Sequence, residues 1–384
     1  MQSCEQRVDN APKFDHHHDK PPRHYTRPPP HGTTFPKEFA PSFCYRPPVK
    51  PTGTHRHEPK RGTLRLLSET QSVRAHYANL VAHCKTATVY QTTAWLDVWK
   101  HLGAELAFIE VDSETMLPFV CRGRGAFRRA YSLPFDTYGG PVTARPNGPV
   151  SFERAVEPLG NASTRVVDFA SGMASLNGAA RRVTSHVVDL SKGAESAVQR
   201  YSDSNHRLIR QARDHRVRID VIEDAAQVRA FYALHLRTVA RHGARPLSRA
   251  FFDAVFASLV PVGLATFYLA RHDGNVVAGN LVLRHHDRAY DWMWVYDERY
   301  LHLRATNLLI DRAVRDEAAR GALQLNLGAS PNDRLGSVRF KQSFGATPFD
   351  YVVYAHNRGL VTTARRAREN AVRVGARLRV LLAR

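Results

Sequence analysis

One lysine stands out among the side chains that could do chemistry. Lys341 is the only lysine after Lys192, in a stretch that otherwise uses arginine. An ammonium group is a compact charge with three donors, so a lysine kept against that background indicates a need for a point charge. The alternative is a surface lysine at the edge of a helix. Arg339, two residues earlier, is either a ligand for a phosphate or carboxylate or a plain surface cation.

Three further polar residues fall at the ends of expected strands or in expected loops, where a cleft would open. They are Asp291, Tyr296 and Ser330. Each either acts directly on a substrate or has a structural role. We interpret Trp292 and Trp294, which lie between them, as core residues of a buried strand.

The basic segment 192–215 predicts a helix or a helix pair. Asn205, Arg207 and Arg210 on this segment could contact an anionic substrate, such as a lipid-linked diphosphate or a nucleotide sugar. The alternative is a solvated helix face. Asn307 falls in the first turn of a helix expected at 304–320, where free N–H groups and the helix dipole favour anions.

Motifs for other kinds of chemistry are absent from the sequence. It contains no G-x-S-x-G, H-E-x-x-H, G-x-x-x-x-G-K-[ST] or G-x-G-x-x-G pattern. The four cysteines, Cys4, Cys44, Cys84 and Cys121, form no CxxC pair, so neither a zinc site nor a redox pair is expected. The sequence therefore predicts no metal site.

The second half of the chain has a clear order of elements that must position these residues. We expect helices at 192–215, 224–241, 248–259 and 304–320, and strands at 217–222, 263–271, 276–283, 288–296, 323–327 and 349–355, with a short helix before the last strand. Asp273-Gly274 predicts a tight hairpin turn. A meander followed by one helical crossover onto a further strand is typical of an α+β layer arrangement.

The first half is less regular. Helices are expected at 68–83 and 93–102, strands at 105–111, 116–122 and 128–133, and a loop at 133–141 where Gly139-Gly140 permits positive φ. The apolar stretch 250–270 is interrupted by Pro261 and Gly263, so it predicts a buried helix and a strand rather than a membrane span.

This order of elements, with the residues on it, resembles the FemABX-type peptidyltransferases and related GNAT-superfamily acyltransferases, including cellulose- and exopolysaccharide-associated acetyltransferase domains. The stretches behind the resemblance are Asn205-His-Arg-Leu-Ile-Arg-Gln-Ala-Arg213, Val277-Ala-Gly-Asn-Leu281, Asn307-Leu-Leu309, Leu327-Gly-Ala-Ser330 and Arg339-Phe-Lys-Gln-Ser-Phe-Gly345, with Gln91-Thr-Thr-Ala-Trp95 and Tyr138-Gly-Gly-Pro141 in the first half. The resemblance implies tandem GNAT-like domains, with mixed, mostly antiparallel sheets flanked by helices. It also implies transfer of an acyl or aminoacyl group to an amine.

Acyl transfer requires removal of a proton from the amine and stabilisation of an oxyanion. The resemblance gives the pair Phe340-Lys341 a part in stabilising the transition state, and we count Tyr296 and Asp291 with it as catalytic candidates. It places the pyrophosphate of acyl-CoA at the helix N-terminus near Asn307. Ser330, Arg339 and the polar residues of 192–215 are the other candidates for substrate or donor binding.

One segment departs from the acyl-CoA loop of that superfamily. Arg299-Tyr-Leu-His-Leu-Arg-Ala-Thr306 has no glycine, and Leu301 and Leu303 would hinder a close backbone approach. Both acyl-CoA and aminoacyl-tRNA therefore stay open as the co-substrate, and no bound cofactor is expected.

The net charge of +20 is concentrated at the chain ends. The Pro/His-rich tail 1–62, net +5, is expected to be disordered, and 358–384, net +7, forms a basic amphipathic helix. Between them we expect an N-terminal GNAT-like half, 63–190, and a C-terminal GNAT-like domain, 191–357.

We hypothesise an N-acyltransferase that acts on an amine of a cell-wall or exopolysaccharide precursor. The alternative is a non-catalytic protein that binds a polyanion, RNA or an anionic membrane, on a GNAT-like scaffold. tRNA is a potential partner and no DNA is expected. The N-terminus lacks the apolar stretch of a secretory signal, so a cytoplasmic location is expected, with contact at the inner membrane face through 358–384 as an option.

Overall fold

A computed structural model describes residues 64–124, 127–135, 137–144, 149–160, 162–170, 172–175, 180–241, 245–330 and 335–356. The chain divides into two compact units, residues 1–59 and 60–384, and all described residues belong to the second. The expected tail at 1–62 and the expected helix at 358–384 lie outside the described residues.

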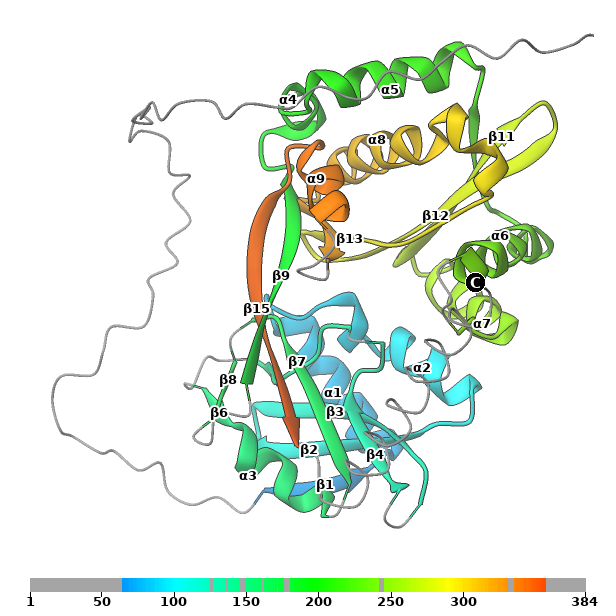
Figure 1. The fold of residues 1–384 in the computed structure, drawn as a ribbon. Helices are drawn as coiled ribbons and strands as arrows, with labels where there is room; N and C mark the ends of the chain where they lie inside the picture. The colour runs from blue at the N-terminus through cyan, green and yellow to red at the C-terminus, as the bar shows by residue number, and fades with distance from the viewer. Residues whose placement is uncertain are drawn as a thin grey trace, which may run out of the picture. The chain divides into compact units, whose positions relative to one another are not determined.

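The first half of the described chain supplies eight strands and three helices (Figure 1). They are β1 (Arg65–Ser68), α1 (Gln71–His83), α2 (Thr93–His101), β2 (Glu105–Asp112), β3 (Thr115–Arg122), β4 (Arg129–Ser132), β5 (Val142–Thr143), β6 (Val150–Ser151), α3 (Phe152–Val156), β7 (Ser163–Asp168) and β8 (Met173–Ala174). Short 3-10 helices span Val89–Gln91 and Glu157–Leu159. The expected helix at 68–83 begins at Gln71, because the side chain of Thr70 caps it by accepting from the Val73 N–H.

The second half supplies the remaining described elements. They are β9 (Ala180–Asp189), α4 (Gly193–Gln199), α5 (Asp203–Asp214), β10 (Arg218–Val221), α6 (Val228–Arg241), α7 (Arg249–Leu259), β11 (Ala265–His272), β12 (Asn275–His285), β13 (Arg288–Tyr296), α8 (Ala305–Ala319), β14 (Gln324–Ala329), α9 (Leu335–Gln342) and β15 (Thr347–His356). Further 3-10 helices span Ala225–Gln227 and Glu298–Leu303. The expected hairpin is confirmed, since Asp273 and Gly274, both at positive φ, join β11 to β12.

The two halves repeat one arrangement. In the first half, β2, β3 and β4 form an antiparallel meander, and the chain crosses through α3 to β7, which pairs parallel with β4. In the second half, β11, β12 and β13 form the meander, and α8 leads to β14, parallel to β13. The tandem arrangement of mostly antiparallel sheets with flanking helices is therefore confirmed.

The last strand joins the two halves into one sheet. β15 lies between β7 and β9, antiparallel to both, and the strand order is β1-β2-β3-β4-β7-β15-β9-β14-β13-β12-β11-β10, with β5 also on β3. β6 and β8 pair separately. Because β9 pairs with β14 and β15, the sheet runs continuously through the expected boundary at residue 190, and that boundary stays a prediction.

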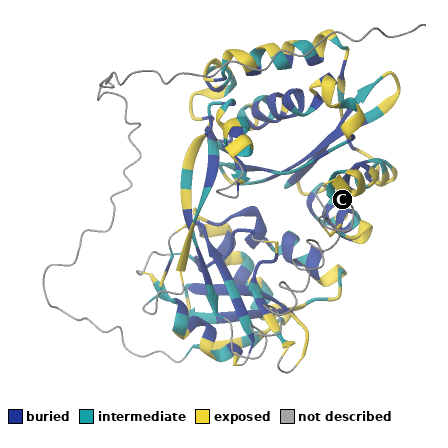
Figure 2. Cartoon of the chain, in the orientation of Figure 1, coloured by how far each residue is buried: buried dark blue, intermediate teal, exposed yellow. Residues whose placement is uncertain are grey.

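Helices cover both faces of the second-half sheet (Figures 1 and 2). α4, α5 and α8 bury one face, in a core that contains Ile209, Leu309 and Val282. α6 and α7 pack on the other face and share a second core with α1 and α2, in which Trp95 contacts Phe251. Residues 250–270 form α7 and the start of β11, as expected. No helix in the described part of the chain is long and apolar enough to cross a membrane.

Candidate active site

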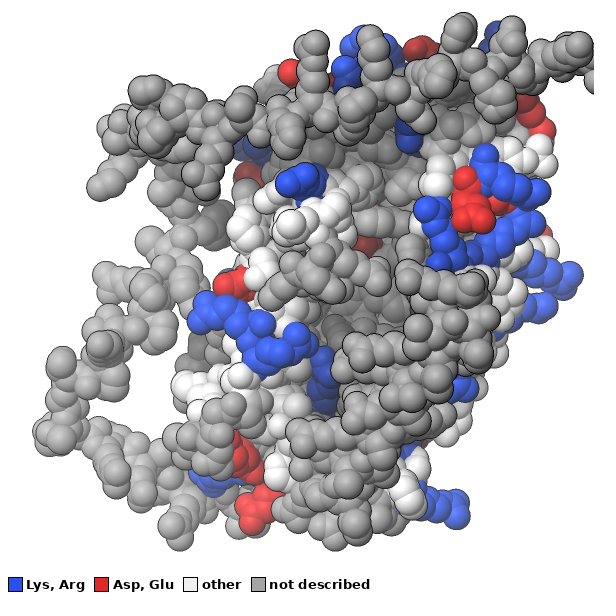
Figure 3. All heavy atoms as spheres, viewed as in Figure 1, with Lys and Arg blue, Asp and Glu red and all other residues white. Residues whose placement is uncertain are grey.

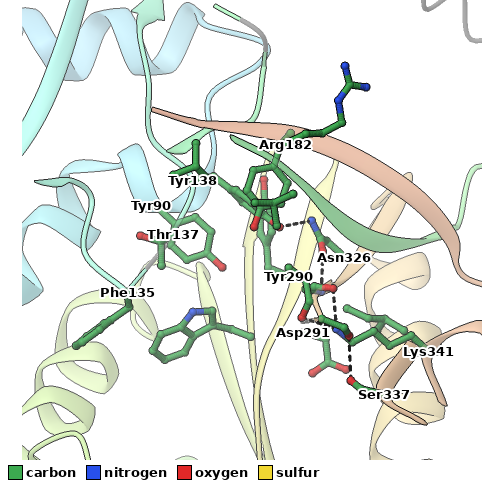
Figure 4. A pocket seen from close by; sticks show the side chains of 18 of the residues that line it. Tyr90, Phe135, Thr137, Tyr138, Arg182, Tyr290, Asp291, Asn326, Ser337 and Lys341 are labelled. Atoms are coloured by element: carbon green, nitrogen blue, oxygen red, sulfur yellow. Dashed lines mark hydrogen bonds between the residues drawn. The ribbon is translucent and has the colours of Figure 1, made fainter. Parts of the chain in front are cut away.

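The two halves of the sheet enclose a cavity of about 830 Å³. Figure 4 shows Tyr90 and Thr137 of the first half on one side of it, and Asp291 and Lys341 of the second half on the other. Residues far apart in the sequence therefore face one space, which is large enough for a small-molecule substrate.

The cavity opens where two parallel strands separate. β13 and β14 pair only through Arg288–Tyr290 and Gln324–Asn326, although β13 continues to Tyr296 and β14 to Ala329. Beyond that point the facing backbone groups have no partner in the neighbouring strand. Asp291 is the first residue of β13 past the last pair.

Lys341 bonds to β14 beyond this separation. Its side chain is 3% exposed, and Nζ donates to the carbonyl oxygens of Gly328, over 2.7 Å, and Ala329, over 2.8 Å. Burial lowers the pKa of Lys341 to about 8, against the opposing effect of the Asp291 carboxyl. Two of its three N–H groups are used, so one is left for a group in the cavity.

Asp291 lies on the cavity wall with its side chain 3% exposed. Burial raises the pKa of this carboxyl to about 7, although Trp294, Asn280 and Lys341 each favour the charged form. Neither carboxyl oxygen makes a hydrogen bond of good geometry with any described residue. A buried carboxyl on a cavity wall with a pKa near 7 has the properties that a general base or acid needs.

Two segments that lie 48 positions apart in the sequence build the first-half wall. The Gln91 side-chain amide donates to the carbonyl oxygens of Gly139, over 3.3 Å, and Gly140, over 3.2 Å. Gly139 has no room for a side chain, because a Cβ there would lie 2.4 Å from the Ser132 carbonyl oxygen. The two hydrogen bonds from Gln91 hold the loop that presents Thr137 and Tyr138 to the cavity.

A buried hydrogen-bond ring connects the two halves at the cavity. The Tyr138 hydroxyl donates to Ser185 Oγ over 3.3 Å, and Ser185 Oγ donates to Asn326 Oδ1 over 2.6 Å. The Asn326 amide donates back to the Tyr138 hydroxyl over 3.0 Å. The ring holds the loop of the first half against β9 and β14.

Basic side chains gather at one side of the cavity. Arg165 of β7 and Arg181 and Arg182 of β9 line it, and Figure 3 shows a row of basic side chains over the strands that Figure 1 labels β7, β15 and β9. Arg182 pairs with Asp350 over 3.3 Å. Among the described lining residues, Asp291 is the one carboxylate, so with Lys341 the cavity has a positive potential that favours an anionic ligand.

A second cavity, of about 300 Å³, adjoins the N-terminus of α8. Phe340, Tyr296 and Asn307 line it, with the basic residues Arg241 and Arg304. Arg304, the N-cap of α8, has a left-handed backbone and gives no side-chain cap. Its carbonyl oxygen accepts from the Asn307 N–H over 3.0 Å, which leaves the N–H groups of Ala305 and Thr306 for a ligand. Asp297 also lines the cavity, and Arg241 pairs with Glu298 over 3.7 Å, so the expected anion binding at this helix end stays a prediction.

The two cavities share part of their walls. Trp294 and Ser337 line both, and the Trp294 ring packs against Phe340 at 5.4 Å. Ser330, in the larger cavity, exchanges a hydrogen bond with Ser337 over 2.9 Å. The two tryptophans that we interpreted as core residues pack partly into the two cores, and both also line a cavity.

Two expected binding residues contact each other instead of facing the larger cavity. The Asn307 amide donates to Asn205 Oδ1 over 2.8 Å, and the Asn205 amide donates to the Ser343 carbonyl oxygen over 3.3 Å. Asn205 is fully buried and thus supports the start of α8 and the end of α9. The structure therefore brings Lys341, Asp291 and Ser330 to one cavity, and Phe340, Tyr296 and Asn307 to the other.

Three expected basic residues lie away from both cavities. Arg207 and Arg210 are exposed on α5, and Arg339 is exposed on α9. None of them lines either cavity.

Several cavity residues were not singled out as functional from the sequence. They include Tyr90, Tyr290, Asn326 and the arginines of β7 and β9. The 149–190 stretch is weakly patterned, so its arginines could not be assigned to a face. Asn326 could have been found from the sequence. The expected strand Leu323-Gln-Leu-Asn-Leu327 has two polar side chains, Gln324 and Asn326, among apolar ones.

Comparisons with known proteins bear on the family and the fold of the chain. Residues 200–342 match the family model described as an acetyltransferase (GNAT) domain. The crystal structure of FemX has 11% sequence identity and a TM-score of 0.57, over 75% of this chain and 96% of that one. A conserved protein of unknown function from Bacteroides thetaiotaomicron has 10% identity and a TM-score of 0.51, over 76% of this chain and 100% of that one. No curated protein sequence matches the chain.

The family match covers the meander, the crossover helix α8 and most of α9, including Asp291 and Lys341. At these low identities the similarity to the solved structures concerns the fold. The chain is therefore an acyltransferase with a GNAT domain over residues 200–342, and it shares its fold with FemX.

Proposed function

We propose that this protein transfers an acyl or aminoacyl group to an amine of a cell-wall or exopolysaccharide precursor. The observation behind the proposal is the pair of buried groups at the strand separation. Asp291 lies on β13 and Lys341 bonds to β14, and both face the larger cavity.

Asp291 acts as the general base. An amine is mostly protonated at neutral pH and must lose a proton before its nitrogen lone pair can attack a carbonyl carbon. A carboxyl with a pKa of about 7 accepts that proton near neutral pH. As the new C–N bond forms and the bond to the donor breaks, the leaving group takes up a proton.

Lys341 stabilises the negative charge on the carbonyl oxygen of the tetrahedral intermediate. Its ammonium is held by the Gly328 and Ala329 carbonyls and needs no reorganisation during the reaction. The third N–H is available to the oxyanion.

The smaller cavity receives the acyl donor. Both acyl-CoA and aminoacyl-tRNA bear phosphates, which suit the free N–H groups at the start of α8 and the side chains of Arg241 and Arg304. Leu301 of the glycine-free segment lines the cavity, so the expectation that it hinders a close backbone approach of acyl-CoA stays a prediction. Because Trp294 and Ser337 belong to both walls, an acyl group has a short route to the larger cavity.

The larger cavity receives the acceptor. Its arginines suit a phosphate or carboxylate, and the rings of Tyr90, Tyr290 and Trp292 offer flat apolar surfaces for a sugar. An amine-bearing, anionic sugar or peptidoglycan-type precursor combines these features.

The test is a transfer assay that crosses two donor classes with a panel of amino sugars, nucleotide-linked amino sugars and lipid-linked precursors, read by mass spectrometry. Acylation of an anionic amino-sugar acceptor, lost in Lys341→Ala and kept in Arg339→Ala, supports the proposal. Arg339 is a matched control because it lies exposed on the same helix. Product formation at equal rates in wild type and Lys341→Ala contradicts it.

A further inference from the structure

The pairing of β12 with β13 contains an irregularity next to the candidate base. Leu281 pairs with Met293, but the next residue, Val282, pairs with Asp291, so Trp292 is an extra residue on β13. This is a β-bulge, and a bulge changes which face of the sheet the following side chains occupy.

The bulge places Asp291 and Trp294 on one face. Residues three apart in a regular strand point to opposite faces, and residues two apart share a face. Here Trp292 packs against the core of α6 and α7, whereas Trp294 packs against the core of α8. Asn280, the partner of Trp294 on β12, points to the same face.

Three buried polar groups therefore converge there. Asn280 is 0% exposed and Asp291 is 3% exposed. The Asn280 amide, both Asp291 oxygens and the Trp294 indole nitrogen have no hydrogen-bond partner of good geometry among the described residues. An unpaired buried polar group costs stability, so a cluster of them indicates a function.

We propose that Asn280 and Trp294 are positioning residues that hold the Asp291 carboxylate toward the acceptor amine and stabilise its charged form. Asn280 lines neither cavity, whereas Trp294 lines both. The amide N–H₂ of Asn280 and the indole N–H of Trp294 are donors and the Asp291 carboxylate is an acceptor, so the unpaired groups are chemically complementary. The role of the amine rests on the proposed function, whereas the coupling among the three side chains does not.

Two charged groups act on the Asp291 carboxyl from neighbouring elements. Lys341 on α9 favours the charged form, and Glu317 on α8 disfavours it. Glu317 is itself paired with Arg284 of β12 over 2.6 Å and with Arg320 over 3.3 Å. The uncharged donors of Asn280 and Trp294 supplement Lys341 in favouring the carboxylate.

The test is a direct titration of Asp291 in the full chain by NMR with ¹³C-labelled aspartate carboxyls. Wild type is expected to show a carboxyl that titrates near pH 7 and is missing in Asp291→Asn. In Asn280→Leu and in Trp294→Phe, which lose the donors and keep an apolar side chain, the midpoint rises by about one pH unit. Asn275→Leu, exposed at the start of the same strand, is the control and leaves the midpoint unchanged.

An unchanged midpoint in either variant overturns the role of the residue that was replaced. If Asn280→Leu does not fold, the Trp294→Phe variant alone provides the test. A structural role for Asn280 predicts loss of stability with no movement of the midpoint. The proposal predicts instead that the midpoint rises, whatever the change in stability. A wild type that shows the titration but transfers no acyl group contradicts the proposed function alone.

Discussion

The side-chain amide of Asn326 donates a hydrogen bond to the Tyr138 hydroxyl over 3.0 Å, across 188 positions of the sequence. This bond joins β14, one of the two strands that separate, to the loop that Gln91 holds in the first half. The two walls of the larger cavity are thus positioned relative to each other by buried polar contacts. The site depends on the first half as well as on the GNAT domain.

Tyr138→Phe removes one member of that ring and leaves the Asn326 amide without its acceptor. We expect a loss of about 1–3 kcal/mol in the free energy of unfolding, because a buried donor loses its partner. Urea unfolding measures it. Tyr131→Phe on β4 is the control, since the Tyr131 hydroxyl has no hydrogen bond among the described residues. Equal losses in both variants would show that the ring contributes nothing specific.

Lys341→Ala is expected to reduce kcat by about 10²–10³-fold, the usual effect of removing one donor to an oxyanion. Lys341→Arg should not restore the rate, because a planar guanidinium cannot occupy the ammonium position between the Gly328 and Ala329 carbonyls. Steady-state kinetics with the identified substrates provides the measurement. A kcat near the wild-type value in Lys341→Ala would assign the lysine to structure alone.

The pH dependence of kcat/KM should be bell-shaped. Activity rises as Asp291, with a pKa raised to about 7, loses its proton, and it falls as Lys341, with a pKa lowered to about 8, loses its own. The two midpoints belong to the pair, since the groups interact. A flat profile between pH 5 and 9 would remove both groups from the reaction.

Arg304→Gly isolates the charge at the donor cavity. Arg304 has a left-handed backbone, with φ at 55°, which glycine adopts without strain, so the start of α8 keeps its geometry. The KM for the phosphate-bearing donor should rise about tenfold and lose part of its salt dependence, with little effect on the KM for the acceptor. Arg210→Ala, exposed on α5, is the control. An unchanged KM for the donor would place the donor elsewhere.

The order of elements in the second half could be predicted from the sequence, because its helices and strands have strong periodicity and clear turn signals. The sequence predicted strand β13 with its observed bounds, Arg288–Tyr296. The bulge at Trp292 could not be predicted, because it depends on the register between two strands. Strict alternation would place Asp291 and Trp294 on opposite faces, whereas the bulge places them on one face.

The candidate site could be predicted only in part, because some of its residues come together through long-range pairing. Lys341 stands out by composition, Asp291 as a carboxyl within the apolar strand 288–296, and Ser330 by its position after an expected strand. Asn205 and Asn307 attracted attention as polar residues on helices, and the structure pairs them with each other. Arg165 and Arg181 enter the cavity because β15 aligns β7 with β9, a long-range pairing that no local pattern encodes.

The central claim, that Asp291 removes the proton of the acceptor amine, is tested most directly by the rate of acyl transfer in Asp291→Asn across pH. The account predicts a loss of at least about 100-fold at pH 7. The deficit should shrink steadily above pH 9, where the amine is already neutral and needs no base. Asp291→Asn with the wild-type rate at pH 7, or with a deficit that stays constant up to pH 10, would contradict the account.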